Sequence, residues 1–381
     1  MKKICVVTWY SSPNYGTQLQ SASLCKYLEE QGLEVHILHK FKVKEYLLRH
    51  PSMLISRVKM KLHTKKKDEF FHPVSYEVTP EQQKNINRYI SDNFRPIDIK
   101  TMDQWNKIIK EKWMFITGSD IIWQPALGSP NKMFLDFARF EKLTRVAYAS
   151  STGAKKLPEK YYRDYKKLLK GFKAISTREQ NSADFFSELL GRKVYKVIDP
   201  TLLHDKDFWD GFAAKAQLGD TIKKEYILCY FVMEDPRYWE YVKKVVSDNP
   251  DKQIVVLPMH YSDEKSEYTV IKTGTAYEFI NLIKNSSFIV TDSFHAAVFS
   301  FIYDKEFYVL KRARSDEDEK FNDLVNKYEL RHRIVTNETE FVRNTDTDYS
   351  AGKKVLEKDR KFAYNFLSKA LELRSSEVPA E

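Results

Sequence analysis

Short apolar segments alternate with helical segments along nearly the whole chain, and this alternation restricts the fold more than any other feature. The clearest unit has an apolar run at residues 288–291, a polar turn at Asp292 and Ser293, a helix over 294–303 and another apolar run at 307–310. Apolar runs of this length between helices are typical of strands buried in a parallel sheet. The pattern therefore predicts an α/β fold.

The strand and helix units form two series, separated by a mixed, polar segment at residues 205–222. We therefore expect two doubly wound domains that face a cleft, and a chain of 381 residues is long enough for both. The expected divisions are an N-terminal domain at 1–210 with a charged helical insertion at about 41–110, a C-terminal domain at 211–345, a helix at 346–373 that packs back across the domains, and a disordered tail at 374–381.

Composition narrows the classes of function. No run approaches the roughly 18 apolar residues of a membrane-spanning helix, and the apolar run at the start is better explained as a buried strand than as a signal peptide. Three scattered cysteines form neither a disulfide framework nor a metal knuckle, which fits a reducing cytoplasm. The net charge of +10 leaves nucleic acid, an anionic membrane or acidic small molecules as partners. Nucleic acid is the least favoured, because no signature of a nucleic-acid-binding fold accompanies the charge.

His295 lies in the first turn of the helix at 294–303, just beyond the carboxyl end of a predicted strand. Ligands bind at that position in open α/β sheets, and helix amino ends attract anions. A histidine there can bind an anionic ligand and transfer protons near neutral pH. The alternative is a histidine that merely caps or packs against the turn.

The loop after the first predicted strand contains Asn14 and Gln18. It lies where a phosphate-binding glycine loop is usual, but neither the dinucleotide-binding nor the Walker pattern is present. The two amides suggest recognition of hydroxyl groups, as a sugar needs. The alternative is an ordinary loop in which Asn14 caps the following helix.

Two further strand ends carry candidate binding groups. Asp120 could accept a hydrogen bond from a substrate hydroxyl and Trp123 could stack on a sugar ring, although an aspartate after a strand is more often a helix cap. Arg178 opens a helix after a short strand, where its guanidinium could grip a phosphate or carboxylate. An ion pair with Glu179 is the alternative. We interpret His36 and His39 as structural and predict no metal.

Six short segments, in this order, resemble the polysaccharide pyruvyl transferase family, and the resemblance covers about residues 3–335. The segments are Asn14-Tyr15-Gly16 with Leu19-Gln20, Gly118-Ser119-Asp120 with Trp123, Ser176 with Arg178-Glu179, Asp199-Pro200-Thr201, Gly274 with Glu278-Phe279, and Thr291-Asp292-Ser293-Phe294-His295-Ala296.

The resemblance implies two Rossmann-like domains, as in GT-B glycosyltransferases, with the acceptor on the N-terminal side and the donor on the C-terminal side. It implies a transferase that uses phosphoenolpyruvate, without another cofactor, to form a ketal on two hydroxyls of one sugar in a cell-surface or lipid-linked glycan. His295 would then be the general acid or an anion ligand, and Arg178 would clamp the donor. The amides of Asn14 and Gln18 would face the acceptor with Asp120, which is also a candidate base.

The chain departs from the family at one point, because some members have Arg-Leu-His where this chain has Ser293-Phe294-His295. The donor site would then include Ser293 and would take its second cation from Lys311, Arg312 or Arg314, after the next strand. A GT-B-type glycosyltransferase that uses a nucleotide sugar is the alternative function, and a non-catalytic protein of a polysaccharide assembly is a third.

The implied setting is capsular or exopolysaccharide biosynthesis. The partner would be a lipid-linked acceptor, and the protein would be cytoplasmic or peripheral at the inner membrane face. The helix at 354–373 could touch anionic lipid, but its amphipathic pattern favours packing across both domains.

Overall fold

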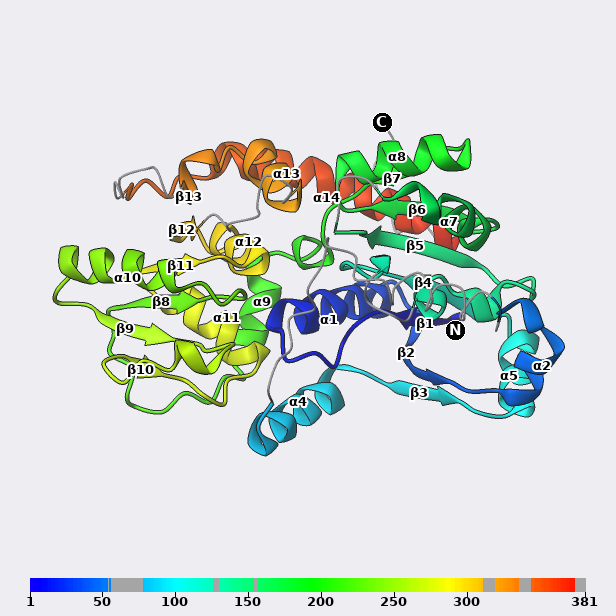
Figure 1. Ribbon diagram of the computed structural model, residues 1–381, viewed down its shortest axis with the longest axis horizontal. Coiled ribbons are helices and arrows are strands. Elements are labelled where there is room, and N and C mark those ends of the chain that lie inside the picture. The colour runs from blue at the N-terminus through cyan, green and yellow to red at the C-terminus, as the bar shows by residue number, and fades with distance from the viewer. Residues whose placement is uncertain are drawn as a thin grey trace.

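A computed structural model describes residues 1–53, 55, 78–125, 130–153, 157–310, 319–335 and 344–373. Within these ranges the chain forms two β-sheets with helices packed around them, and all paired strands run parallel (Figure 1). The expected donor residues Lys311, Arg312 and Arg314, the tail at 374–381 and part of the expected insertion lie outside the described residues.

The first sheet has seven strands in the order β3-β2-β1-β4-β5-β6-β7. These strands are β1 (Lys3–Val7), β2 (Glu34–Phe41), β3 (Pro96–Ile99), β4 (Met114–Thr117), β5 (Arg145–Ser150), β6 (Ala174–Thr177) and β7 (Tyr195–Lys196). The helices in this half are α1 (Tyr15–Glu30), α2 (Lys44–Arg49), α4 (Pro80–Asn93), α5 (Met102–Lys110), α6 (Pro130–Met133), α7 (Tyr162–Leu169) and α8 (Gln180–Leu190), with 3-10 turns η2 (Asp136–Ala138), η3 (Glu159–Tyr161) and η4 (Pro200–Leu202).

The second sheet has six strands in the order β10-β9-β8-β11-β12-β13. These strands are β8 (Tyr226–Tyr230), β9 (Gln253–Val256), β10 (Thr269–Val270), β11 (Phe288–Thr291), β12 (Glu306–Leu310) and β13 (Ile334–Val335). The helices that follow η4 are α9 (Lys206–Ala213), α10 (Pro236–Asp248), α11 (Ala276–Asn285), α12 (Phe294–Ile302), α13 (Glu319–Lys327) and α14 (Ser350–Leu371), with 3-10 turns η5 (Tyr261–Asp263) and η7 (Arg331–Arg333).

Strand order reverses once in each sheet, between β1 and β4 in the first and between β8 and β11 in the second. Such switch points open a crevice at the carboxyl ends of the two strands, and ligands bind there in doubly wound folds. The loops that follow β1, β4, β8 and β11 are therefore the places where the fold can build a site. The expected α/β fold with two doubly wound sheets is confirmed.

One expected feature differs. The segment at 41–110 was expected to be helical, but it contributes β3 at the edge of the first sheet. Pro96 begins this strand, and an edge strand tolerates proline because one of its sides carries no ladder partner. The polar segment at 205–222 likewise contains a helix, α9, which Asp205 caps by accepting a hydrogen bond from the Phe208 amide at 3.1 Å.

The two halves share one hydrophobic core. Helix α1 of the first half contacts α11 and α12 of the second, and a single cluster of buried residues includes Leu19 from α1, Trp209 from α9 and Phe299 from α12. Helix α12 is buried on every side, which explains why its sequence is apolar all round. The crevices of the two sheets are therefore held at a packed interface.

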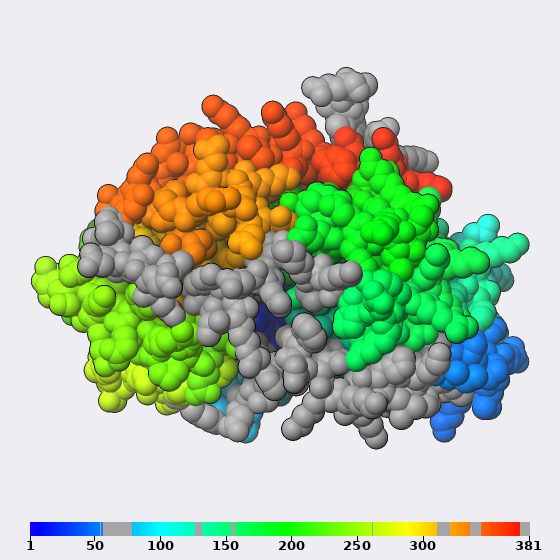
Figure 2. Space-filling model, turned by 45° about the horizontal axis from the view of Figure 1, so that its top comes forward, coloured from blue at the N-terminus to red at the C-terminus, as the bar shows by residue number. Residues whose placement is uncertain are grey.

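Helix α14 ties the halves together. Its buried Leu367 belongs to the shared core, and its Arg360 donates from Nε to the Leu202 carbonyl at 2.8 Å. On the second half, Tyr328 donates from its hydroxyl to Asp359 of α14 at 2.8 Å. Figure 2 shows the orange and red C-terminal residues lying beside both the green and the yellow-green parts of the chain. Among the described helices, none combines the length and apolar character needed to cross a membrane.

Candidate active site

His295 stands at the interface of the two halves. It lies in the first turn of α12, which Ser293 caps by accepting a hydrogen bond from the Ala296 amide at 3.4 Å. Its imidazole packs against Gly16 at the start of α1, where a Cβ atom would come within 2.0 Å of Nδ1. The side chain is nearly buried, and its Nε2 makes no hydrogen bond to any described group. The ring is therefore held by contacts from both halves.

Asp199, just before η4, faces that imidazole. Its Oδ1 lies 3.7 Å from His295 Nε2 and accepts hydrogen bonds from the amide and hydroxyl of Thr201 at 3.0 and 2.8 Å. Burial alone would raise the pKa of the Asp199 carboxyl, but His295, Arg178 and the Thr201 amide outweigh it and hold that pKa well below its usual range. The group is therefore a carboxylate placed to pair with an imidazolium.

Arg178 completes this cluster. It is buried, and it donates from Nε to Glu179 and from Nη1 to Asp199, each at 3.0 Å. Its guanidinium carbon lies 5.0 Å from the ring centroid of Phe294, within cation–π range. Burial lowers the pKa of the guanidinium, but the carboxylates of Glu179, Asp199 and Asp120 raise that pKa by more than burial lowers it. The guanidinium therefore remains charged. The ion pair that the sequence left as an alternative is present, and any ligand must use the remaining N–H groups.

Asp120 joins the cluster from the loop after β4. Its Oδ2 accepts a hydrogen bond from the Thr17 hydroxyl at 3.0 Å, and its Oδ1 accepts one from the Ile121 amide at 2.8 Å. Three described carboxylates, those of Asp120, Glu179 and Asp199, therefore act electrostatically on Arg178. Even with a protonated His295 the described cluster is negative, so an anionic ligand needs further positive groups.

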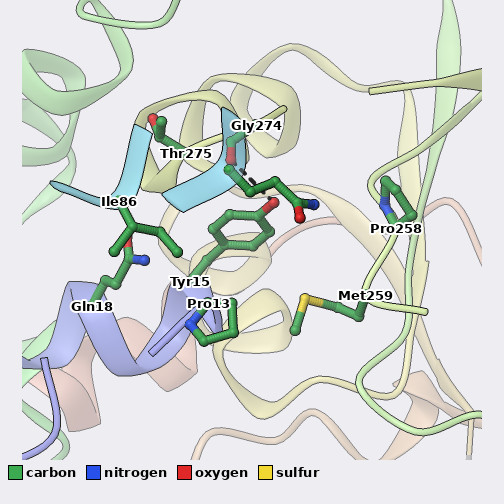
Figure 3. Close-up of a pocket in the computed structure, with 9 residues that line it drawn as sticks. Pro13, Tyr15, Gln18, Ile86, Pro258, Met259, Gly274 and Thr275 are labelled. Carbon is green, nitrogen blue, oxygen red and sulfur yellow. Dashed lines mark hydrogen bonds between the residues drawn. The ribbon is translucent and has the colours of Figure 1, made fainter. Parts of the chain in front are cut away.

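Asn14 and Gln18 were both expected to face the acceptor, but their side chains have different partners. Asn14 caps α1 by accepting a hydrogen bond from the Thr17 amide at 3.3 Å, as its alternative interpretation foresaw. Gln18 donates to the Ser12 carbonyl at 2.8 Å, while its buried Oε1 has no described partner. Gln18 lines a small pocket beside Tyr15 (Figure 3), and His295 is not among the residues that line it.

Trp123 requires a correction. It was expected to stack on a sugar, but its side chain is fully buried and its ring is stacked on Phe134, with centroids 5.4 Å apart and planes at 5°. Its indole N–H donates to the Met133 carbonyl at 3.2 Å. Burial of a large aromatic surface outweighs exposure here, so Trp123 supports the loop after β4 and presents no ring face to a ligand.

Two groups that matter to the site were not singled out as site residues from the sequence. Asp199 appeared only within the Asp199-Pro200-Thr201 segment of the family resemblance, without a role of its own, and its acidic side chain before a proline was a further signal. Gln20 is fully buried and joins the loops after β1 and β4, donating to the Trp9 carbonyl at 3.1 Å and accepting from the Ser119 amide at 3.1 Å. Its signals were its place in the Leu19-Gln20 part of the family resemblance and a polar side chain on the apolar face of a helix.

Within the described ranges, no group of three or more His, Cys, Asp or Glu side chains is arranged to hold a metal ion. The expected independence from metals stays a prediction.

A comparison with models of known protein families shows which family the chain belongs to. The family model described as polysaccharide pyruvyl transferase matches residues 14–314, most of the chain. The chain belongs to the polysaccharide pyruvyl transferase family. The family resemblance drawn from the six segments is thereby confirmed, and the protein is classed as a transferase. The matched span contains Gly16, Asp120, Arg178, Asp199 and His295, so the whole cluster lies in the part that defines this transferase family. No curated protein matches the chain.

Solved structures similar to this pyruvyl transferase family member share its fold at low identity. A UDP-N-acetylglucosamine 2-epimerase aligns at 13% identity with a TM-score of 0.50, covering 100% of this chain and 98% of its own. A putative UDP-N-acetylglucosamine 2-epimerase from Listeria monocytogenes aligns at 10% identity, TM-score 0.48, with 97% and 90% covered. A spinosyn forosaminyltransferase aligns at 11%, TM-score 0.41, with 98% and 96% covered. The first likeness supports the expected GT-B-like fold and nothing further.

Proposed function

We propose that the protein transfers pyruvate from phosphoenolpyruvate to two hydroxyls of one sugar, in a cell-surface or lipid-linked glycan, and forms a cyclic ketal. Family membership supports this reaction class. The observation that carries the proposal is the pairing of His295 Nε2 with the buried Asp199 carboxylate at 3.7 Å. A reaction that begins by protonating a carbon needs a positioned acid, and a carboxylate beside an imidazole stabilises the protonated form.

In the first step the protonated imidazole of His295 donates a proton to the methylene carbon of phosphoenolpyruvate. The electron pair of the carbon–carbon double bond forms the new C–H bond, and the neighbouring carbon becomes an oxocarbenium-like centre. His295 is then neutral. Asp199 stabilises the imidazolium before transfer and keeps the ring oriented during it.

In the later steps one sugar hydroxyl attacks the cationic carbon and its proton passes to the neutral imidazole. The C–O bond to phosphate breaks, and the second hydroxyl closes the ketal on the same carbon. Its proton leaves with the phosphate, so that one phosphoenolpyruvate and two hydroxyls yield one ketal and one hydrogen phosphate. Asp120, which already accepts a hydrogen bond from the Thr17 hydroxyl, is the proposed base that takes this second proton and passes it to the departing phosphate.

The donor carries several negative charges, whereas the described cluster is itself negative. The amino end of α12 and the unpaired N–H groups of Arg178 supply part of the attraction. The proposal assigns the remainder to Lys311 and Arg312, which follow β12 in the sequence.

The test measures phosphate release from phosphoenolpyruvate with a panel of glycans, and detects the ketal by the mass gained by the acceptor. We expect His295→Gln to abolish both signals, and His36→Gln, a surface histidine paired with Glu34, to leave them unchanged. Phosphoenolpyruvate should also raise the unfolding temperature, because a ligand at a hundredfold excess over Kd stabilises a folded protein by about 2.7 kcal/mol. Stabilisation by nucleotide sugars alone would overturn the proposal and favour a glycosyltransferase.

A further inference from the structure

A groove lies on the second half of the molecule, at the carboxyl ends of β8 and β9. Its cavity volume is about 320 Å³, which lies at the lower end of the range typical of small-molecule sites. Its wall includes Glu234, Asp235, Trp239, Ser262, Lys265 and Tyr268. These residues are separate from the His295 cluster, and the steps proposed above use none of them.

Aromatic rings form one wall of the groove. The rings of Trp239 and Tyr268 lie within 21° of parallel with centroids 6.0 Å apart, and Phe231 supports Trp239 edge-on at 5.5 Å. Both groove rings are only partly buried. Lys265 Nζ also lies 5.3 Å from the Trp239 ring centroid. A pyranose ring would pack its C–H face against the ring area that Tyr268 and Lys265 leave exposed, because aromatic rings offer apolar area at little conformational cost.

The charge of the groove selects among ligands. Four carboxylates and two ammonium groups line the groove. The carboxylates belong to Glu234, Asp235, Glu240 and Glu267, and the ammonium groups to Lys243 and Lys265. Arg237, outside the lining, pairs with Asp235 and still leaves the balance negative. A phosphate or nucleoside diphosphate would be repelled, whereas carboxylates accept hydrogen bonds from sugar hydroxyls.

One further polar group points to a ligand with hydroxyls. The hydroxyl oxygen of Ser262, on the groove wall, is buried and has no hydrogen-bond partner within the described chain. A buried polar group without a partner is unfavourable. Because this oxygen exposes almost no surface, a sugar hydroxyl would satisfy it only after a rotation of the Ser262 side chain toward the groove.

The groove is continuous with the loop that supports the active site. Asp292, three residues before His295, accepts hydrogen bonds from the amides of Val232 and Met233 at 2.6 and 3.0 Å. The next residue in the chain, Glu234, lines the groove. His260 is hydrogen-bonded through Nε2 to the Val232 carbonyl at 2.9 Å, which ties the loop after β9 to the same place. The loop after β8 therefore links the wall of the groove to the residues that precede His295.

We propose that this groove binds a neutral sugar unit of the acceptor glycan, next to the unit that receives the ketal. The inference that this sugar belongs to the acceptor glycan rests on the proposed function. The chemistry of the ligand rests on the groove itself, and the ligand is a pyranose that stacks on Trp239 and Tyr268 and donates hydroxyls to the carboxylates.

The test labels the full chain, which has six tryptophans, with 5-fluorotryptophan. Fluorine NMR then follows the signal of Trp239. Trp239→Phe assigns the resonance. The probes are the methyl glycosides of glucose, galactose, mannose and N-acetylglucosamine, each at on the order of 50 mM, since a single-sugar contact gives millimolar affinity. We expect at least one glycoside to shift the Trp239 signal and to leave the buried Trp105 and Trp209 unchanged.

Matched variants test the role of the rings. Tyr268→Ala should weaken the glycoside response roughly three- to tenfold, the range for losing one aromatic contact. Tyr241→Ala, on the same helix as Trp239 but outside the groove lining, should leave the response unchanged. A Trp239 signal that no glycoside moves, or that UDP moves at lower concentration than any glycoside, would overturn the assignment.

A separate arm distinguishes this inference from the proposed function. Phosphoenolpyruvate should stabilise Tyr268→Ala as much as it stabilises the wild type, because the donor does not occupy the groove. If glycosides shift Trp239 while phosphoenolpyruvate neither binds nor releases phosphate, the pyruvyl transfer fails and the sugar site stands. If phosphoenolpyruvate is turned over but the Trp239 signal stays fixed, the sugar site fails alone.

Discussion

The imidazole of His295 lies so close to Gly16 that a Cβ atom at position 16 would sit 2.0 Å from Nδ1 and 2.8 Å from the Cβ of the histidine. The two residues belong to different halves of the molecule, at the amino ends of α12 and α1. Glycine is therefore required at this point by a close approach of a side chain to the backbone, and no unusual backbone torsion is involved. The contact sets where the ring stands relative to Asp199.

Gly16→Ala should displace the imidazole and lower kcat by on the order of a hundredfold, since a misplacement of about 1 Å can cost that much. Overpacking should also lower the free energy of unfolding by about 1–3 kcal/mol. Gly211→Ala is the matched control, because a Cβ there meets no atom of the described structure within 4 Å and alanine is the better helix former. Full activity in Gly16→Ala, measured by phosphate release, would show that the contact is unimportant.

Asp199→Asn tests the buried carboxylate. At pH 7 it should lower the free energy of unfolding by about 3–5 kcal/mol, because Arg178 and His295 lose a buried counter-charge. The pKa of Asp199 is lowered in the folded state, so its contribution is present above the unfolded value of about 3.9 and is lost as pH falls below it. Urea titrations at pH 7 and pH 3 should therefore show a smaller difference from wild type at the lower pH.

The control for Asp199→Asn is Asp98→Asn. Asp98 pairs with Lys100 at 2.8 Å on the surface, and loss of such a pair costs about 1 kcal/mol or less. Equal effects of the two substitutions at pH 7 would contradict a special role for Asp199.

Arg178→Lys should abolish the stabilisation by phosphoenolpyruvate and lower the free energy of unfolding by about 1–3 kcal/mol. A lysine ammonium is a point charge and cannot reproduce the fork that reaches Glu179 and Asp199 together. Arg360→Lys, which removes a fork to the backbone of Leu202 and His204, should keep the ligand response despite its own loss of stability. A normal response in Arg178→Lys would place the donor elsewhere.

His204 should make stability depend on pH between about 4 and 6.5. Its pKa is lowered to about 4, chiefly by burial, so the unfolded state binds more protons across this interval and stability falls as pH falls. The contribution lost by pH 4 is at most roughly 3 kcal/mol. Urea unfolding of His204→Gln should show a shallower decline between pH 7 and pH 4.5 than wild type. Parallel curves would mean that His204 is not the titrating group.

Local patterns in the sequence predicted the strands and helices of the described core well. Short apolar runs such as 288–291 and 307–310 became buried parallel strands, because a strand covered on both faces must be apolar along its length. Edge strand β3 was missed because it is only four residues long and begins with proline, and neither its length nor its composition separates it from the charged segment around it.

The individual site residues were harder to predict. Arg178, Asp120 and His295 were selected because each follows a predicted strand, and the carboxyl ends of parallel strands meet at one edge of a sheet. The role of Trp123 was misjudged, because an exposed ring and a buried ring in a loop have the same sequence. Burial depends on Phe134 and Phe186, which pack around it in the folded chain.

The sequence by itself determined the α/β class, the two series of units and the family, because periodicity and short motifs are local properties of the chain. Only the tertiary structure decided that Asp199 faces His295, that Gly16 receives the imidazole, and that Trp239 and Tyr268 line a groove. These groups lie far apart in the chain or on separate loops. Their proximity depends on how two sheets and their connecting helices pack, and no short stretch of sequence contains that information.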